Sequence, residues 1–179
     1  DLQKHLGRLD SDRIIITIAN LVPVKGIEIL INTFEKLTLD YPNWKLMIVG
    51  ENSTEYGKTL TINTNEKANL INKIIFTGKR NDTNKLLDLG EIYVQPTLHK
   101  GRMEGAPIAI LEAMSNGKVV IGSDIPGIKD QLKEFPSQLF KAGDYNELNK
   151  KLVFHMSNNI EDNIEFGKKF VNIAKNKYD

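Results

Sequence analysis

The sequence contains no cysteine, few histidines and no long apolar run. Without cysteine, neither a disulfide framework nor a zinc–thiolate site can form. The three histidines, His5, His99 and His155, are far apart and lack the spacing of metal ligands. No apolar stretch reaches the roughly 18 residues of a membrane-spanning helix, and no signal-peptide pattern opens the chain. We therefore expect a cytoplasmic setting.

Net charge is also nearly absent. Lys and Arg total 24 and Asp and Glu total 23, for a net charge of +1, which argues against a general nucleic-acid-binding surface. The 179 residues suit one α/β domain with a substantial core. The chain begins with Asp and ends within a helical pattern, so we expect a domain of a longer protein.

Short β-branched runs recur along the chain and are apolar on both faces. Such runs are typical of strands buried on both sides of a parallel sheet. They lie at residues 13–19, 45–50, 73–78, 92–96, 118–124 and, more weakly, 138–142. Helical patterns lie between them. This alternation predicts an α/β fold with a Rossmann-like, doubly wound parallel sheet of about six strands.

The helical patterns set the limits of the expected domain. One helix face carries the apolar residues Ile27, Leu30, Ile31, Phe34 and Leu37. Residues 144–179 indicate two helices separated by residues 157–162, and residues 1–12 form a lead-in. We expect one domain over residues 1–179, with its core at about 13–155 and its ligand at the carboxyl ends of the strands.

Several familiar nucleotide and nucleophile motifs are missing. No strand is followed by the Gly-x-Gly-x-x-Gly turn of dinucleotide-binding folds, and no Gly-x-Ser-x-Gly elbow occurs. "GENSTEYGKT" follows a strand, but six residues separate Gly50 from Gly57, where a P-loop needs four. We expect a polar loop entering a helix there.

An acidic residue interrupts an apolar helix at residues 107–117. Pro107 suits the first helical position, and the amides of Gly105, Ala106 and Ile108 lie where a helix dipole attracts an anion. Glu112 lies about 7.5 Å farther along the axis, in a helix that we expect to be largely buried, where a carboxylate needs hydrogen-bond donors. With Glu104 before the helix, the spacing predicts an anion site flanked by two carboxylates. The simpler alternatives are a loop carboxylate at Glu104 and a solvated one at Glu112.

These residues resemble a known signature. "EGAPIAILE" is similar to the Glu-(seven residues)-Glu motif of retaining glycosyltransferases of family 4, which have the GT-B fold. Further resembling segments occur in the family's order: "ANLVPVKGIEILINTF", "LMIVGE", "IIFTGKRND", "IYVQPT" and "ILEAMSNGKVVIGSDIPGIKD". The resemblance covers about residues 13–155. It implies the C-terminal, donor-binding domain of such an enzyme, with the N-terminal acceptor domain absent from this chain.

The resemblance also implies how the donor nucleotide is held. Glu112 would accept hydrogen bonds from the ribose hydroxyls. The amides of Gly105 and Ala106 would cradle the diphosphate, and Gly78 and Lys79 would border the nucleobase.

Two residues would act at the reacting bond. Glu104 would face hydroxyls of the donor sugar, and Lys25 would neutralise the diphosphate; a solvated lysine is the simpler alternative for Lys25. No metal or other cofactor is expected, because cations and the helix dipole take that role. Asn20 stands where the family usually has an arginine that contacts phosphate, so affinity is weaker or another cation, such as Arg102, replaces it.

The implied function is transfer of a glycosyl group, with retention, from a nucleotide-diphosphate sugar to an acceptor in bacterial surface polysaccharide or glycolipid biosynthesis. The partners would be this donor, and a glycan or lipid-linked acceptor bound through the missing domain. We expect the isolated domain to be inactive and the full-length protein to associate peripherally with the inner membrane face. The alternatives are a degenerate nucleotide-sugar-binding module without catalysis, which Asn20 favours, and another GT-B enzyme such as a sugar-nucleotide epimerase or a phosphorylase.

Overall fold

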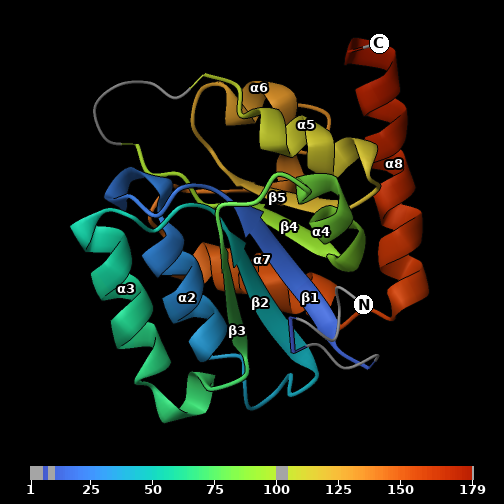
Figure 1. Ribbon diagram of the computed structural model, residues 1–179. Helices are drawn as coiled ribbons and strands as arrows, with labels where there is room; N and C mark the ends of the chain where they lie inside the picture. Colours follow the sequence, from blue (N-terminus) through green and yellow to red (C-terminus); the bar gives the residue numbers. More distant parts are fainter. Residues whose placement is uncertain (1–5, 8–10, 100–104, 179) are drawn as a thin grey trace.

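A computed structural model describes residues 6–7, 11–99 and 105–178 of the chain. It contains a six-stranded parallel sheet with helices on both faces (Figure 1). The strands are β1 (Arg13–Ile18), β2 (Trp44–Val49), β3 (Ile74–Gly78), β4 (Ile92–Gln95), β5 (Val119–Ser123) and β6 (Leu139–Phe140). All six predicted strands are confirmed; β2 is shifted by one residue from its apolar run, and the other five are shorter than theirs.

The strand order is β3-β2-β1-β4-β5-β6. The chain builds outward from β1 to β3, and then returns to the other side of β1 to lay down β4, β5 and β6. This order confirms the predicted doubly wound fold. The prediction that every strand is buried on both sides is wrong for β3, whose residues are all partly exposed because β3 is an edge strand.

Helices connect the strands and close the chain. They are α2 (Ile27–Glu35), α3 (Glu55–Asn65), α4 (Thr83–Leu89), α5 (Ile108–Ser115), α6 (Ile128–Gln131), α7 (Tyr145–Met156) and α8 (Ile160–Tyr178), with short 3₁₀ turns η1 (Pro23–Lys25), η2 (Ala68–Leu70) and η3 (Pro136–Gln138). The two predicted C-terminal helices are confirmed, with a break of only three residues, 157–159. In the part of the chain described, no helix combines the length and apolarity needed to cross a membrane.

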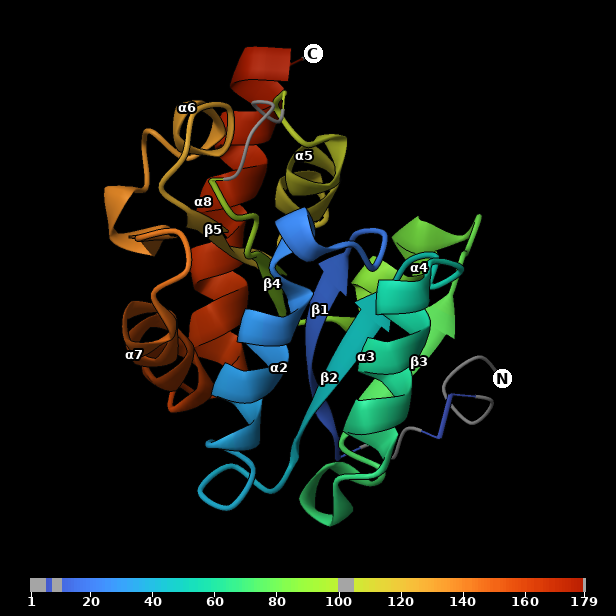
Figure 2. The same ribbon diagram turned by 90° about the vertical axis from the view of Figure 1, so that its left-hand side faces the viewer.

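Helices cover both faces of the sheet (Figure 2), and an apolar core lies between the sheet and each layer of helices. The first is formed with α2, α3 and α7, and includes every residue predicted for the apolar face of α2. The second lies under α4, α5, α6 and α8, where α8 contributes Phe170 and Ala174. Trp44 and Phe135 pack within the fold: Trp44 is buried, and the centre of the Phe135 ring lies 4.0 Å from that of the Phe170 ring.

Side-chain bonds fasten the amino edge of the sheet. The guanidinium of Arg13, on β1, pairs with the carboxylate of Glu91 just before β4. It also donates to the carbonyl oxygen of Asn158 at 2.8 Å and lies 4.3 Å from the centre of the Trp44 ring. Asn163, on α8, donates to the same Glu91 carboxylate at 2.6 Å. Arg13 thus joins two central strands to the turn between the last two helices.

Candidate functional site

Backbone hydrogen bonds align the loops at the carboxyl ends of β1, β2 and β3. The amide of Gly50 donates to the carbonyl oxygen of Gly78 at 3.1 Å, and the amide of Leu21 donates to that of Glu51 at 2.8 Å. The Asn20 side-chain oxygen accepts from the amide of Glu51 at 3.4 Å. The Asn20 side chain therefore helps to hold the turn after β1. Asn20 is exposed, at the same edge of the sheet as Gly78.

The loop after β1 is pressed against the end of β4. Gly26 has a φ of +67°, and a Cβ there would lie 2.0 Å from the carbonyl oxygen of Pro96. The amide of Leu98 donates to the carbonyl oxygen of Val24 at 2.8 Å. These contacts place the loop that carries Lys25 beside the segment that follows β4. The ammonium group is half-buried, and this burial lowers the pKa of Lys25 from its ordinary value.

Helix α5 is the next helix after β4. Pro107 is its N-cap, with an extended ψ of 124°, and the helix starts at Ile108, so the predicted first helical position is wrong by one residue. No side chain of a described residue caps this end, although the first amides of a helix have no intrahelical partner. Gly105 and Ala106 are exposed, and Ile108 is 73% exposed. The described backbone therefore presents open donors at this edge.

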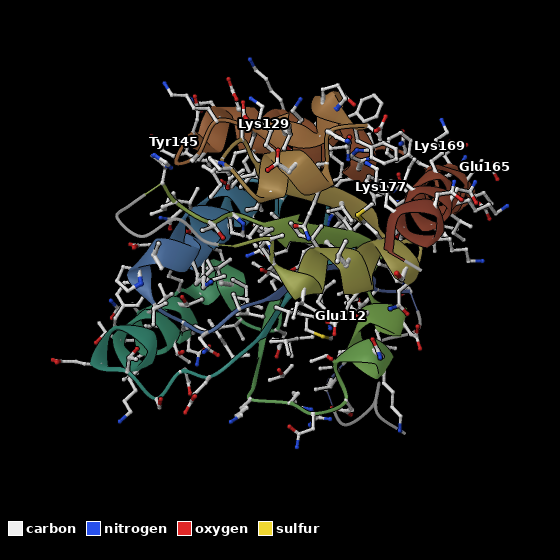
Figure 3. All side chains as sticks on the ribbon, turned by 90° about the horizontal axis from the view of Figure 1, so that it is seen from above. Glu112, Lys129, Tyr145, Glu165, Lys169 and Lys177 are labelled. Carbon is white, nitrogen blue, oxygen red and sulfur yellow. The ribbon has the colours of Figure 1, made fainter. Side chains whose placement is uncertain are left out.

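Glu112 lies on the less buried side of α5. The helix buries Ile110, Ala113 and Met114 and leaves Glu112 partly exposed, so the expectation of a largely buried helix is wrong for about half its circumference. Figure 3 shows Glu112 on the side of α5 that faces away from α6. Its carboxylate makes no hydrogen bond or ion pair with another described residue. It is close enough to help raise the pKa of Tyr93, although burial is the larger cause.

A row of buried polar side chains, joined by hydrogen bonds, lies along this part of β4. We did not predict it from the sequence. The Tyr93 hydroxyl donates to the Gln95 side-chain oxygen at 2.6 Å, and the Gln95 side-chain nitrogen donates to the Thr97 hydroxyl at 3.0 Å. The Ser123 hydroxyl donates to the carbonyl oxygen of Gln95 at 3.2 Å. All four residues are buried. The signal was available, since Tyr93, Gln95 and Thr97 alternate along an otherwise apolar strand.

The remaining predicted residues divide into two groups. Lys79 is exposed directly after β3, and the next residue, Arg80, pairs with Asp82 as an ordinary surface cation does. Glu104 and Arg102 lie outside the described residues. The described part of the chain contains no group of three or more acidic or histidine side chains arranged to hold a metal.

The fold and this edge define the class of protein. Ligands of doubly wound sheets bind outside the carboxyl ends of the strands, where the strand order reverses. That point lies between β1 and β4, and Lys25 and Glu112 come from the segments that follow these two strands. The chain is therefore a doubly wound α/β domain whose candidate ligand site lies at this edge. It belongs to the family described as "Glycosyl transferases group 1", which matches residues 1–177.

Relatives share the fold over much longer chains. The Escherichia coli enzyme UDP-Gal:alpha-D-GlcNAc-diphosphoundecaprenol alpha-1,3-galactosyltransferase is 34% identical over 113 residues, which cover 63% of this chain and 28% of that protein. The structure of Anabaena HepE in complex with UDP-glucose matches with a TM-score of 0.85 and 21% identity, covering 99% of this chain and 48% of that one.

A third relative, a solved structure, is about as long as this chain. The crystal structure of the C-terminal domain of a Francisella tularensis glycosyl transferase group 1 protein has a TM-score of 0.78 and 21% identity, and covers 99% of this chain and 93% of that one. By contrast, the chain spans about a third of the length of the curated relatives it matches.

Proposed function

We propose that this chain binds the nucleoside diphosphate part of a sugar donor at the carboxyl edge of its sheet. The observation that carries the proposal is Glu112: a partly exposed carboxylate without a described partner, on the helix that begins at the strand-order reversal. Two adjacent ribose hydroxyls are donors that suit such a carboxylate. The solved complex of HepE contains UDP-glucose, which supports a donor of this class.

The diphosphate would lie between the start of α5 and Lys25. The amides of Gly105, Ala106 and Ile108, aided by the helix dipole, would donate to its oxygens. Lys25 would supply the positive charge, and a bound anion would counteract the burial that lowers the pKa of this ammonium group. Gly78 and Lys79 would border the base.

The protein that contains this chain would transfer the sugar. The bond between the anomeric carbon and the diphosphate oxygen would break, and its electron pair would stay on the leaving oxygen. The acceptor hydroxyl oxygen would form the new bond to the anomeric carbon, and its proton would pass to the released diphosphate. Lys25 and the helix amides would stabilise that developing charge, while Glu104 would face hydroxyls of the sugar. We further propose that transfer retains the anomeric configuration and needs no metal, as the family resemblance implies.

The acceptor would be a glycan or lipid-linked molecule of a surface-polysaccharide or glycolipid pathway, bound by a further domain. The length of the relatives supports such a domain. A cytoplasmic protein associated peripherally with the membrane would suit a lipid-linked acceptor.

One observation favours a second candidate, a nucleotide-sugar-binding module that has lost catalysis. Asn20 is neutral, and its side-chain oxygen bonds the backbone of the neighbouring loop.

If another cation takes over the phosphate contact, Arg102 is our candidate, and Arg102→Ala should then weaken nucleoside diphosphate binding. Unchanged affinity in that variant would exclude this role for Arg102.

The test is a calorimetric titration of the chain with UDP, GDP and ADP in the presence of EDTA. We expect one of them to bind, and Glu112→Gln to weaken binding about tenfold or more, because hydrogen bonds to charged groups contribute about 1.5–3 kcal/mol. Glu165→Gln, on the exposed side of α8, is the matched control and should bind normally. Equal affinity in Glu112→Gln would refute the ribose contact, and no binding of any diphosphate would refute the donor site.

A further inference from the structure

We propose that Gln131 is a positioning residue for the donor diphosphate, acting through the peptide group between Pro107 and Ile108. This inference rests on the proposed function. The Gln131 side-chain nitrogen donates to the carbonyl oxygen of Pro107 at 3.0 Å, and the residue is 2% exposed. A side chain from α6 thereby grips the N-cap of α5.

The peptide group that Gln131 bonds also carries the first amide of the helix, that of Ile108. The described peptide bonds are all trans, so the Pro107 carbonyl and the Ile108 amide point in opposite directions from one plane. Fixing the carbonyl on the inner side therefore fixes the direction of the amide on the outer side. A hydrogen bond to the carbonyl also polarises the amide and strengthens it as a donor.

The fold brings α6 close enough for this contact. Gly122, on β5, lies beneath α6: a Cβ there would meet Ile128 at 2.6 Å and Leu132 at 2.9 Å. Both of these side chains are fully buried. Because the glycine lets α6 sit directly on β5, Gln131 at the end of the single helical turn reaches Pro107.

Stability alone explains Gln131 poorly. Its side-chain oxygen is buried without a hydrogen-bond partner among the described residues, which costs free energy that an apolar residue of the same length would avoid. The Pro107 carbonyl also has a second donor, the amide of Ile110 at 3.2 Å. Retaining a buried amide here accords with a role in holding the Ile108 donor.

The experiment compares Gln131→Met with Gln138→Met. Gln138 is a matched control, because it is 3% exposed and its side-chain nitrogen likewise donates to a backbone carbonyl, that of Val120, at 3.0 Å. After thermal melts establish folding, each variant is titrated with whichever of UDP, GDP and ADP binds the unaltered chain. We expect about fivefold to tenfold weaker binding for Gln131→Met, and unchanged affinity for Gln138→Met.

A second measurement needs no substitution. In the unaltered chain, labelled with ¹⁵N, the Ile108 amide resonance should shift when the same diphosphate is added. Equal affinities of both variants and the unaltered chain, or an Ile108 amide that does not respond, would overturn the inference while leaving Glu112 and the proposed function intact. If the unaltered chain binds none of the three diphosphates, the proposed function itself fails, and this inference with it.

Discussion

We predict that the buried residue His155 makes this protein less stable as the pH falls into the mildly acidic range. It is 1% exposed on α7, with its ring between those of Phe154 and Phe166, at centroid distances of 5.0 and 5.3 Å. Burial lowers the pKa of His155 from 6.5 to about 4, even though Asn163 and the charge of Glu91 act in the opposite direction. The folded protein therefore keeps this imidazole neutral where the unfolded chain protonates it.

The sign and size of the effect follow from that difference. Between pH 6.5 and about 4 the unfolded chain binds more protons than the folded protein, so the free energy of unfolding falls as the pH is lowered. Integrating this difference from pH 7.5 to pH 4.5 gives a loss of about 2–3 kcal/mol from His155 alone. Above pH 6.5 this contribution is fully present.

His155→Gln isolates the contribution. Glutamine cannot titrate, and its side-chain nitrogen can replace the ring nitrogen that lies 3.0 Å from the Gln138 side-chain oxygen. Urea unfolding of both proteins at pH 7.5 and pH 4.5 can be followed through Trp44, the single tryptophan, which is buried. We expect the variant to be less stable at pH 7.5 and to lose about 2–3 kcal/mol less on acidification.

Two carboxylates, those of Glu35 and Asp82, also titrate in acid and are the same in the unaltered protein and in His155→Gln. The pKa of Glu35 is lowered, mainly by its hydrogen bond from Lys67, and that of Asp82 by its bond from Arg80. These carboxylates also lose stabilising contacts in acid, but equally in both proteins. Identical losses of stability in the two proteins would refute the assignment to His155.

Two further substitutions test the two edges of the sheet. Gly26→Ala should lower the free energy of unfolding by about 2 kcal/mol or more, because it places a Cβ against the Pro96 carbonyl oxygen in a left-handed conformation; calorimetric titration should show weaker diphosphate binding as well. Arg13→Met should cost about 2 kcal/mol or more in urea unfolding, because it leaves the largely covered Glu91 carboxylate without its cation. Adding Glu91→Gln to Arg13→Met should restore part of that loss, and a double variant as unstable as the single one would contradict this explanation.

The strands and the larger helices could be predicted because their signals are local. Isoleucine-rich runs such as residues 13–19 define a strand wherever it lies in a sheet, and the spacing of Ile27, Leu30 and Phe34 defines one helix face. The partial exposure of β3 could not be predicted in this way. It depends on the strand order, which follows from long-range packing rather than from the residues of β3.

The places of two candidate-site residues in the fold could be predicted in the same way, while their role in binding stays a prediction. Lys25 and Glu112 were placed correctly at the carboxyl edge because each follows a strand at the point where the order reverses. The exposure of Glu112 was misjudged, because the width of the buried stripe on α5 depends on how closely α6 and α8 approach. Gln131 gave no local signal at all: its contact with Pro107 joins residues 24 positions apart. Glu104 stays a prediction.

The two edges of the sheet differ in what holds them. Side chains fasten the amino edge, and Arg13 or Glu91 cannot change without breaking a bond. At the carboxyl edge, the amides of Leu21, Gly50 and Leu98 donate to backbone carbonyl oxygens. Every residue except proline has such an amide N–H. Apart from glycines such as Gly26 and bonding side chains such as that of Asn20, neighbouring residues there can be exchanged while the loops keep their course. Such an edge lets one scaffold acquire a new substrate preference by substitution alone, without rebuilding the frame that supports it.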